Sequence, residues 1–131
     1  MKRTLIVIDM QKDFIDGALG TPEAQTIVPA VREKISTYRK RGDEIILPRN
    51  VHRSVLNALV LCGAIPVYVN PEVDQRLGIS LGMKREQVAK AIAEHPKAVA
   101  VLVNNPTYYG VCADIRKIAK LAHDHGMLLL A

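Results

Sequence analysis

Apolar runs of strand length alternate with stretches of helical period along this chain. Residues 5–8 form a continuous apolar run between Arg3 and Asp9, which is typical of a strand that is covered on both faces. Because parallel strands are usually joined by a helix, this alternation predicts a parallel sheet with helices on both sides. Further strands are expected at 44–47, 65–69, 98–103 and 127–130. The sequence thus predicts a three-layer α/β domain with five parallel strands.

The expected helices carry recognisable start and stop signals. Thr21 offers a capping hydroxyl, Pro22 suits the first helical position, and Gly42 is typical of a helix end. Three more helices are expected at 51–62, 86–95 and 114–125, and a long loop at 70–82. A chain of 131 residues can bury one substantial core but rarely two, so we expect one domain over 1–131.

Composition excludes several classes of protein. The chain has a net charge of +5, but its basic residues are spread over the expected helix faces and only 4% of residues are aromatic, so nucleic-acid binding is not expected. The apolar runs are shorter than the roughly 20 residues that span a bilayer. The first residues do not form a signal peptide, so a cytoplasmic location is expected. Cys62 and Cys112 have no metal-site spacing and are expected to be buried free thiols.

No specific partner is expected beyond a second copy of the chain. Five strands form a small open sheet, and an uncovered sheet edge or helix face is a surface through which copies associate. Homo-oligomer formation is therefore the one interaction that the sequence suggests.

Residues 5–14 read LIVIDMQKDF, 17–19 read GAL, and 41–43 read RGD, with Pro29 between them. This pattern resembles the isochorismatase-like hydrolases, in particular nicotinamidase, over residues 1–46. The resemblance implies that Asp9 corresponds to the aspartate that serves a cysteine nucleophile together with a lysine. The matching lysine and cysteine lie in family segments that this chain lacks, and Cys112 is not expected to replace them. Asp9 is therefore at most a vestigial catalytic residue.

Residues 48–54 read PRNVHRS, 66–71 read PVYVNP, and 105–112 read NPTYYGVC. This second pattern resembles the large domain of the pyridoxal-phosphate-dependent ornithine, lysine and arginine decarboxylases, over residues 47–131. The resemblance implies that the segment from Asn105 to Thr107 is similar to one that contacts the cofactor ring. The family's Schiff-base lysine, pyridine-side acid and phosphate loop have no counterpart here, so no cofactor is expected. Asn50, Asn105 and Thr107 are weak candidates for cofactor contacts.

Two unrelated families in one chain suggest a chimera with its junction within 42–50. We therefore predict an engineered or recombined α/β scaffold without native catalytic activity, and not an enzyme. One alternative is a truncated amide hydrolase of the nicotinamidase type, and another is a vestigial module that binds phosphate or pyridoxal phosphate. No metal site is expected, because Asn50 stands where the hydrolases have a metal-binding aspartate and a neutral amide is a weak ligand.

The two resemblances also constrain the strand order. The hydrolases place their first strand beside the second, and the decarboxylases run the matching strands as 3-2-4-5. Both conditions are met by the Rossmann-like order 3-2-1-4-5, with the flavodoxin-like order 2-1-3-4-5 as the alternative. In either order a crevice at the carboxyl edge of the sheet gathers a set of polar residues, namely Asp9, Asn50, Asn70, Asn104, Asn105 and Thr107.

Overall fold

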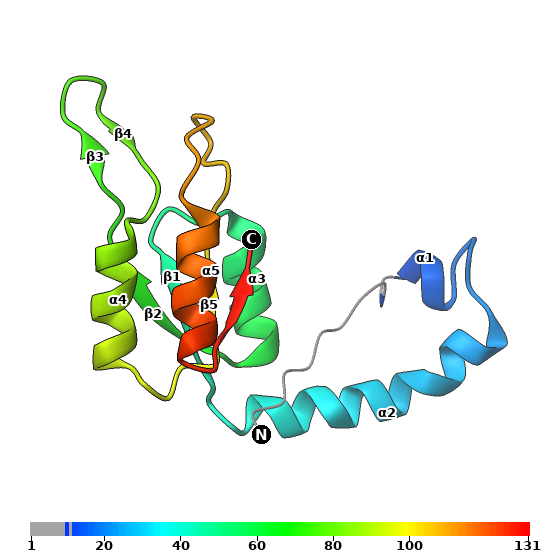
Figure 1. Cartoon of the computed structure of the whole chain (residues 1–131). Helices are drawn as coiled ribbons and strands as arrows, with labels where there is room; N and C mark the ends of the chain where they lie inside the picture. Colours follow the sequence, from blue (N-terminus) through cyan, green and yellow to red (C-terminus); the bar gives the residue numbers. More distant parts are fainter. Residues whose placement is uncertain (1–9, 11) are drawn as a thin grey trace.

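The computed structural model describes Met10 and residues 12–131, so the expected strand at 5–8 and the candidate Asp9 lie outside the described residues. The elements in chain order are α1 (Lys12–Ile15), α2 (Pro22–Arg39), β1 (Glu44–Pro48), α3 (Arg53–Cys62), β2 (Ile65–Val69), β3 (Val73–Asp74), β4 (Ile79–Ser80), α4 (Arg85–Glu94), β5 (Ala100–Leu102), α5 (Ile115–Asp124) and β6 (Leu128–Leu130). The α/β class is confirmed, and the longer expected helices and strands in this range are present (Figure 1).

Four parallel strands form the main sheet in the order β2-β1-β5-β6. β1 pairs with β2 along its whole length, with Glu44 opposite Ile65, and pairs with β5 on its other side, with Ile45 opposite Ala100. A strand has two hydrogen-bonding sides, and both sides of β1 are therefore occupied. The expected insertion of 5–8 beside β1 is wrong for both proposed orders. The described strands instead follow the 3-2-4-5 order implied by the decarboxylase resemblance.

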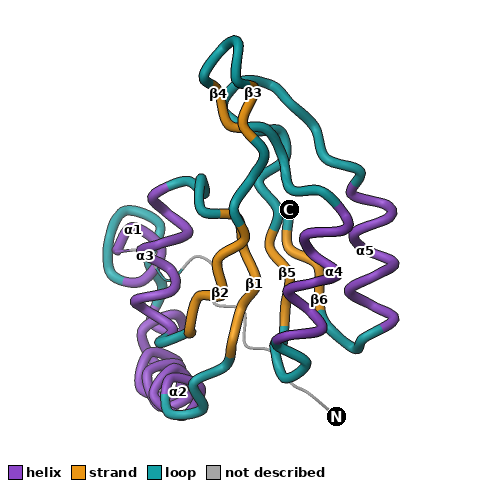
Figure 2. The backbone as a smooth tube through the Cα atoms, turned by 90° about the vertical axis from the view of Figure 1, so that its left-hand side faces the viewer, coloured by secondary structure: helices purple, strands orange, loops and turns teal. Residues whose placement is uncertain are grey.

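Helices cover both faces of this sheet. The connection from β1 to β2 runs in the opposite direction to the connections from β2 to β5 and from β5 to β6. Crossovers of one hand place helices from opposite directions on opposite faces. Figure 2 shows α3 on one side of the sheet and α4 with α5 on the other. The direction of the chain therefore reverses between β1 and β5.

The main core lies between the sheet and the α4–α5 face. β1 contributes Ile46 and β5 contributes Val101, both with 0% exposure. α4 and α5 turn apolar residues toward these strands at helical spacing, and both helices therefore bury one stripe. The buried cluster comprises Ile46, Val69, Met83, Val88, Ala91, Ile92, Ala98, Val101, Val103, Ile118, Ala122 and Met127.

α2 is the longest described helix and runs away from the sheet (Figure 1). Its start agrees with the sequence signals, since the Thr21 hydroxyl accepts a hydrogen bond from Ala24 N at 3.1 Å and Pro22 is the first helical residue. It ends at Arg39, earlier than predicted, and Gly42 follows with φ of 62°. None of its residues is buried. Within the described range, no helix combines the length and apolarity needed to cross a bilayer.

The segment 70–82 contains a small hairpin where a loop was predicted. β3 and β4 pair antiparallel, with Val73 opposite Ser80. The Asp74 carboxylate closes the turn by accepting hydrogen bonds from the backbone N–H groups of Arg76 and Leu77, each at 2.9 Å. Two-residue strands are too short to show an alternating pattern, so the sequence did not reveal them.

Both cysteines differ from the expected buried thiols. Cys62 and Cys112 are free and exposed. Cys62 is the last residue of α3, and Cys112 lies in the loop before α5. Their apolar sequence neighbours suggested burial, but a loop and an outer helix face leave the sulfur atoms accessible.

The core assignment can be tested at Ile46. We expect Ile46→Ala to lower the free energy of unfolding by about 2–5 kcal/mol, because it removes buried methyl groups and leaves a cavity in a packed site. Val60→Ala is the matched control, since Val60 is 72% exposed on α3 and its truncation should change stability by less than about 0.5 kcal/mol. Urea unfolding followed by circular dichroism measures both. Equal effects would contradict this core.

The cap at the start of α5 makes the stability of the fold depend on pH. Asp114 caps α5, and hydrogen bonds from the Lys117 side chain and then from its backbone N–H hold the pKa of Asp114 below its ordinary value. A lowered pKa means that the charged form stabilises the fold above the unfolded-state pKa, and that this contribution is lost as pH falls through the folded-state pKa. We expect Asp114→Asn to destabilise the protein at pH 7 and the difference from wild type to shrink below about pH 4. Urea unfolding across that range measures this difference, and a constant difference would count against it.

Candidate functional site

The carboxyl ends of β1 and β5 meet where the chain reverses direction across the sheet. Ligands of open α/β sheets bind at such switch points, because the loops leaving the two strands separate there. The loop after β1 carries Asn50 and the loop after β5 carries Asn104. The Asn104 side-chain N–H donates to the Asn50 carbonyl at 3.4 Å. The structure therefore brings the two loops that carry Asn50 and Asn105 together.

Thr107 fixes the loop between β5 and α5. Its backbone N–H donates to the Val111 carbonyl at 2.9 Å, and its hydroxyl accepts from the Val111 N–H at 3.2 Å. Gly110 N–H donates to the Thr107 carbonyl at 2.9 Å, with Gly110 at a positive φ of 76° that favours glycine. Thr107 is only 4% exposed. This candidate thus stabilises the loop and does not present an open hydroxyl surface.

Asn105 lies at the entrance of the same loop. Its side-chain oxygen accepts from Ala113 N–H at 2.8 Å, and the following Asn105–Pro106 peptide bond is cis. No residue in the described part of the chain pairs with the Asn105 side-chain N–H₂ group. Because the oxygen is held by the protein, the amide donor is oriented by the fold. Asn105 is thus the sequence candidate with a positioned donor still available.

A polar network that sequence reasoning missed extends the site toward β2. The Arg49 Nε–H donates to the Asn70 side-chain oxygen at 3.0 Å, and its guanidinium carbon lies 4.7 Å from the centre of the Tyr68 ring. The Asn70 carbonyl in turn accepts from Gln87 on α4 at 3.0 Å. The loops after β1 and β2 and the start of α4 are therefore tied together. The only sequence signal was the position of Arg49 and Asn70 directly after two strands.

His52 caps α3 and is not held for a ligand. Ser54 N–H donates to His52 Nδ1 at 3.2 Å, and the Ser54 hydroxyl lies 2.8 Å from the same nitrogen. His52 is thus an exposed residue at a helix N-terminus. His95, His123 and His125 lie at helix C-terminal ends. Among residues 10 and 12–131, no group of three or more metal-ligating side chains is close enough to hold an ion.

Among the described residues, two ion pairs lie around this edge. Lys84 at the start of α4 lies 2.6 Å from Glu72, and the hydrogen bond and charge of Glu72 raise the pKa of Lys84. Asp114 pairs with Lys117 at 2.9 Å. The exposed Cys112 thiol contacts only the Gly110 carbonyl, at 3.9 Å, among the described hydrogen bonds.

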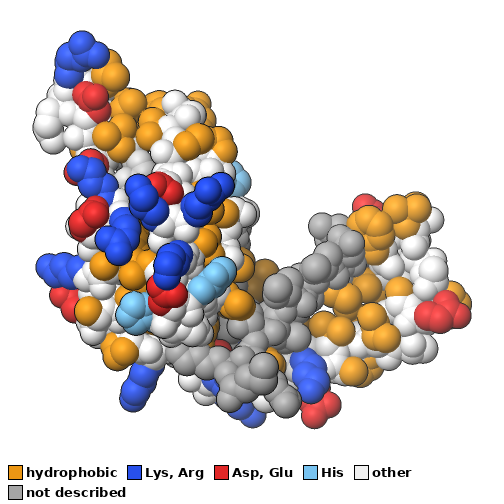
Figure 3. Space-filling view, viewed as in Figure 1, with side chains coloured by type: hydrophobic (Ala, Val, Ile, Leu, Met, Phe, Trp, Pro, Cys, Tyr) orange, Lys and Arg blue, Asp and Glu red, His pale blue; other side chains and the backbone are white. Residues whose placement is uncertain are grey.

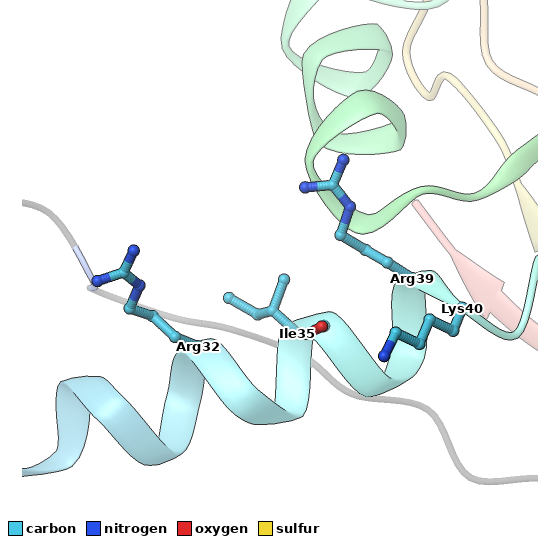
Figure 4. A pocket seen from close by; sticks show the side chains of 5 residues that line it. Arg32, Ile35, Arg39 and Lys40 are labelled. Carbon is cyan, nitrogen blue, oxygen red and sulfur yellow. The ribbon is translucent and has the colours of Figure 1, made fainter.

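A hollow of about 470 Å³ lies elsewhere, along α2, and is lined by Arg32, Ile35, Ser36, Arg39 and Lys40 (Figure 4). All five lining residues belong to one helix or its end, and α2 lies at the opposite end of the molecule from the carboxyl ends of the strands (Figures 1 and 2). The hollow is open, and none of the candidates in the described part of the chain, Asn50, Asn105 and Thr107, is among its lining residues. It is therefore separate from the site at the sheet edge.

The hydroxyl of Thr107 provides a direct test of the loop. We expect Thr107→Val to lower the free energy of unfolding by about 1–3 kcal/mol, because the shape is kept but the Val111 N–H loses its side-chain acceptor. Thr107→Ser keeps the hydroxyl and is the matched control. Hydrogen exchange at Val111 should be faster in the valine variant alone. Similar exchange in both variants would contradict this role.

Curated relatives share a large part of this sequence. The chain is 49% identical over 89 residues to an arginine decarboxylase of Bacillus subtilis strain 168, covering 68% of this chain and 18% of that protein. It is 48% identical over 101 residues to an arginine decarboxylase of Halalkalibacterium halodurans, covering 77% of this chain and 21% of that protein. The chain thus spans about a fifth of the length of these relatives.

A solved structure shares the fold. An aspartate aminotransferase variant of Thermus thermophilus superposes with a TM-score of 0.54 at 25% identity, covering 67% of this chain and 22% of that one. The similarity supports the arrangement of a parallel sheet with flanking helices.

The family model of the Orn/Lys/Arg decarboxylase major domain matches residues 20–131. A chimera joined within 42–50 is wrong, because this single match runs through the junction and includes most of the segment that resembled a hydrolase. The alternative of a truncated amide hydrolase is wrong for the same reason. The prediction of an engineered scaffold that is not an enzyme is also wrong, because relatives at 48–49% identity are arginine decarboxylases. The second resemblance was correct, and the chain belongs to the Orn/Lys/Arg decarboxylase family.

Proposed function

We propose that this chain supplies the cofactor-facing sheet edge of a pyridoxal-phosphate-dependent decarboxylase that acts on a basic amino acid, with arginine as the first candidate. The observation that carries the proposal is the family match over residues 20–131, together with relatives at 48–49% identity that are named arginine decarboxylase. Lysine and ornithine are the other substrates that the family's description contains. The proposal replaces the expectation that no cofactor is bound.

The residues at the switch point suit a contact role toward pyridoxal phosphate. Asn105 has an amide donor oriented by the bond from Ala113 to its oxygen, and Asn50 lies across the switch point on the loop held by Asn104. Amide donors match the phenolic and phosphate oxygens of the cofactor. Asn50 and Asn105 contain no amine and no acid, so they would orient the cofactor without bonding to it covalently, while Thr107 fixes the loop that carries Asn105. Pyridoxal phosphate itself supplies an electron sink when bound.

The loop geometry explains why such contacts would be stable. Thr107 closes the turn through two bonds to Val111, and Asn105 is bonded to Ala113 near the start of α5. Both ends of the loop are therefore fixed by the protein before a ligand arrives. Preorganised donors avoid the entropy cost of ordering on binding, and this favours orientation of a flat ring.

We also propose one domain, a cytoplasmic location and self-association of the chain. One domain over 1–131 is supported by the continuous core between the sheet and α4–α5. A cytoplasmic location is supported by two exposed free cysteines, which suit a reducing compartment. Self-association is supported by β2 and β6 at the edges of the described sheet, where Leu128 is exposed.

Binding of pyridoxal phosphate by the full chain tests the proposal. We expect saturable binding in equilibrium dialysis, weakened about twofold to tenfold by Asn105→Ala, because the variant loses the oriented amide donor together with the oxygen that accepts from Ala113. Asn57→Ala, on the exposed surface of α3, is the matched control and should bind like wild type. Release of labelled carbon dioxide from arginine, lysine and ornithine then ranks the substrates.

Each outcome of the binding experiment tests a different part of the proposal. Selective weakening by Asn105→Ala supports the assignment of the switch-point loop to the cofactor. Binding that is equal in both asparagine variants contradicts that assignment, and the absence of any saturable binding contradicts the proposed function for this chain.

A further inference from the structure

The four tyrosines of the chain fall into two pairs with different surroundings. Tyr38 and Tyr68 each have an arginine over the ring, with the Arg41 and Arg49 guanidinium carbons 4.6 Å and 4.7 Å from the ring centres. Tyr108 and Tyr109 instead contact each other, with ring centres 5.3 Å apart and planes at 89°. No cation from the described part of the chain lies over either of these two rings.

The Tyr108–Tyr109 pair is presented outward by a fixed backbone. Tyr108 is 93% exposed and Tyr109 is 53% exposed. Their loop rises beyond the start of α5 at the carboxyl end of the sheet (Figure 1), where hydrophobic side chains also gather on the surface (Figure 3). The bonds between Thr107 and Val111 hold the backbone on both sides of the pair. The rings therefore project from a defined place, directly after the candidate cofactor residues.

The Tyr108–Tyr109 rings are exposed aromatic groups at this edge that can attract a cation. The whole chain carries a net charge of +5, which repels a positively charged ligand at long range. The nearby carboxylates of Glu72 and Asp114 are already paired with Lys84 and Lys117. An aromatic face attracts a cation through its quadrupole without requiring a net negative charge.

We propose that the Tyr108–Tyr109 pair binds the cationic end of the substrate, a guanidinium or ammonium group, by cation–π contact. This inference rests on the proposed function, because it assumes a basic amino acid whose other end lies at the switch point. An edge-to-face pair keeps outer ring surface available to such a group. A planar guanidinium can stack on that surface more fully than a compact ammonium. The pair is thus a specificity-determining element that favours arginine.

Nuclear magnetic resonance of the full chain tests the inference without requiring turnover. Ring-proton signals are followed during titration with L-arginine and, separately, with L-citrulline, which has a similar length but a neutral end, at matched ionic strength. We expect shifts of the Tyr108 and Tyr109 signals to be at least threefold larger with arginine. The Tyr38 and Tyr68 rings serve as internal controls, because each is already covered by an arginine.

Two variants isolate the ring face. Tyr108→Phe keeps the aromatic face and should retain the arginine-dependent shift of Tyr109, whereas Tyr108→Leu should reduce that shift at least threefold. Tyr108 is so exposed that neither change should disturb folding, which circular dichroism checks. Tyr38→Leu is the matched control, because Tyr38 lies on α2 away from the carboxyl edge of the sheet, and it should leave the Tyr109 response unchanged.

Each result decides the inference separately from the proposed function. Arginine-selective ring shifts support the pair as a cation site even if pyridoxal phosphate does not bind. Equal responses to arginine and citrulline, or a Tyr109 response that survives Tyr108→Leu, overturn it even if the cofactor binds.

Discussion

The pairing of β1 with both β2 and β5 is the constraint on which the site depends. Because β1 is hydrogen-bonded on both sides, its outgoing connection turns toward β2 on one face while the chain from β5 continues to β6 on the other. The reversal separates the loops after β1 and β5 and leaves Asn50 and Asn104 to bridge them. The switch point is thus a consequence of backbone pairing, and the polar residues line a site that the strand order has already created.

Local sequence patterns predicted the positions of most helices and strands, whereas the strand order depends on long-range pairing and was not predicted. β2 was predicted at its observed residues, and α3, α4 and α5 within two residues at each end, because apolar period and end signals are encoded within each segment. Strand order is not encoded in that way. It was inferred from two resemblances, and the hydrolase resemblance placed 5–8 beside β1, where β2 and β5 already pair. The β3–β4 hairpin escaped prediction because its strands are too short for any pattern.

Placement of the candidate residues was more predictable than their contacts. Asn50, Asn105 and Thr107 follow strands whose carboxyl ends share one edge, so the sequence sufficed to group them. Their roles required three-dimensional geometry, since the Thr107 hydroxyl bonds within its own loop and Arg49 bonds to Asn70 on the neighbouring strand's loop. The family error had a different origin. Short motifs supported two resemblances of similar appearance, whereas the match over residues 20–131 weighs the whole length of the domain.

Within the loop after β5, the fold separates the residues that position from the residues that could select a substrate. Asn105 and Thr107 are committed to backbone bonds, and changing them alters the loop itself. Tyr108 and Tyr109 project from that loop and contribute little buried surface to the core, so their chemistry can change without a large cost in stability. Under the proposed function, one end of a ligand would meet the bonded backbone of this loop, and the other end would meet side chains whose replacement costs little stability.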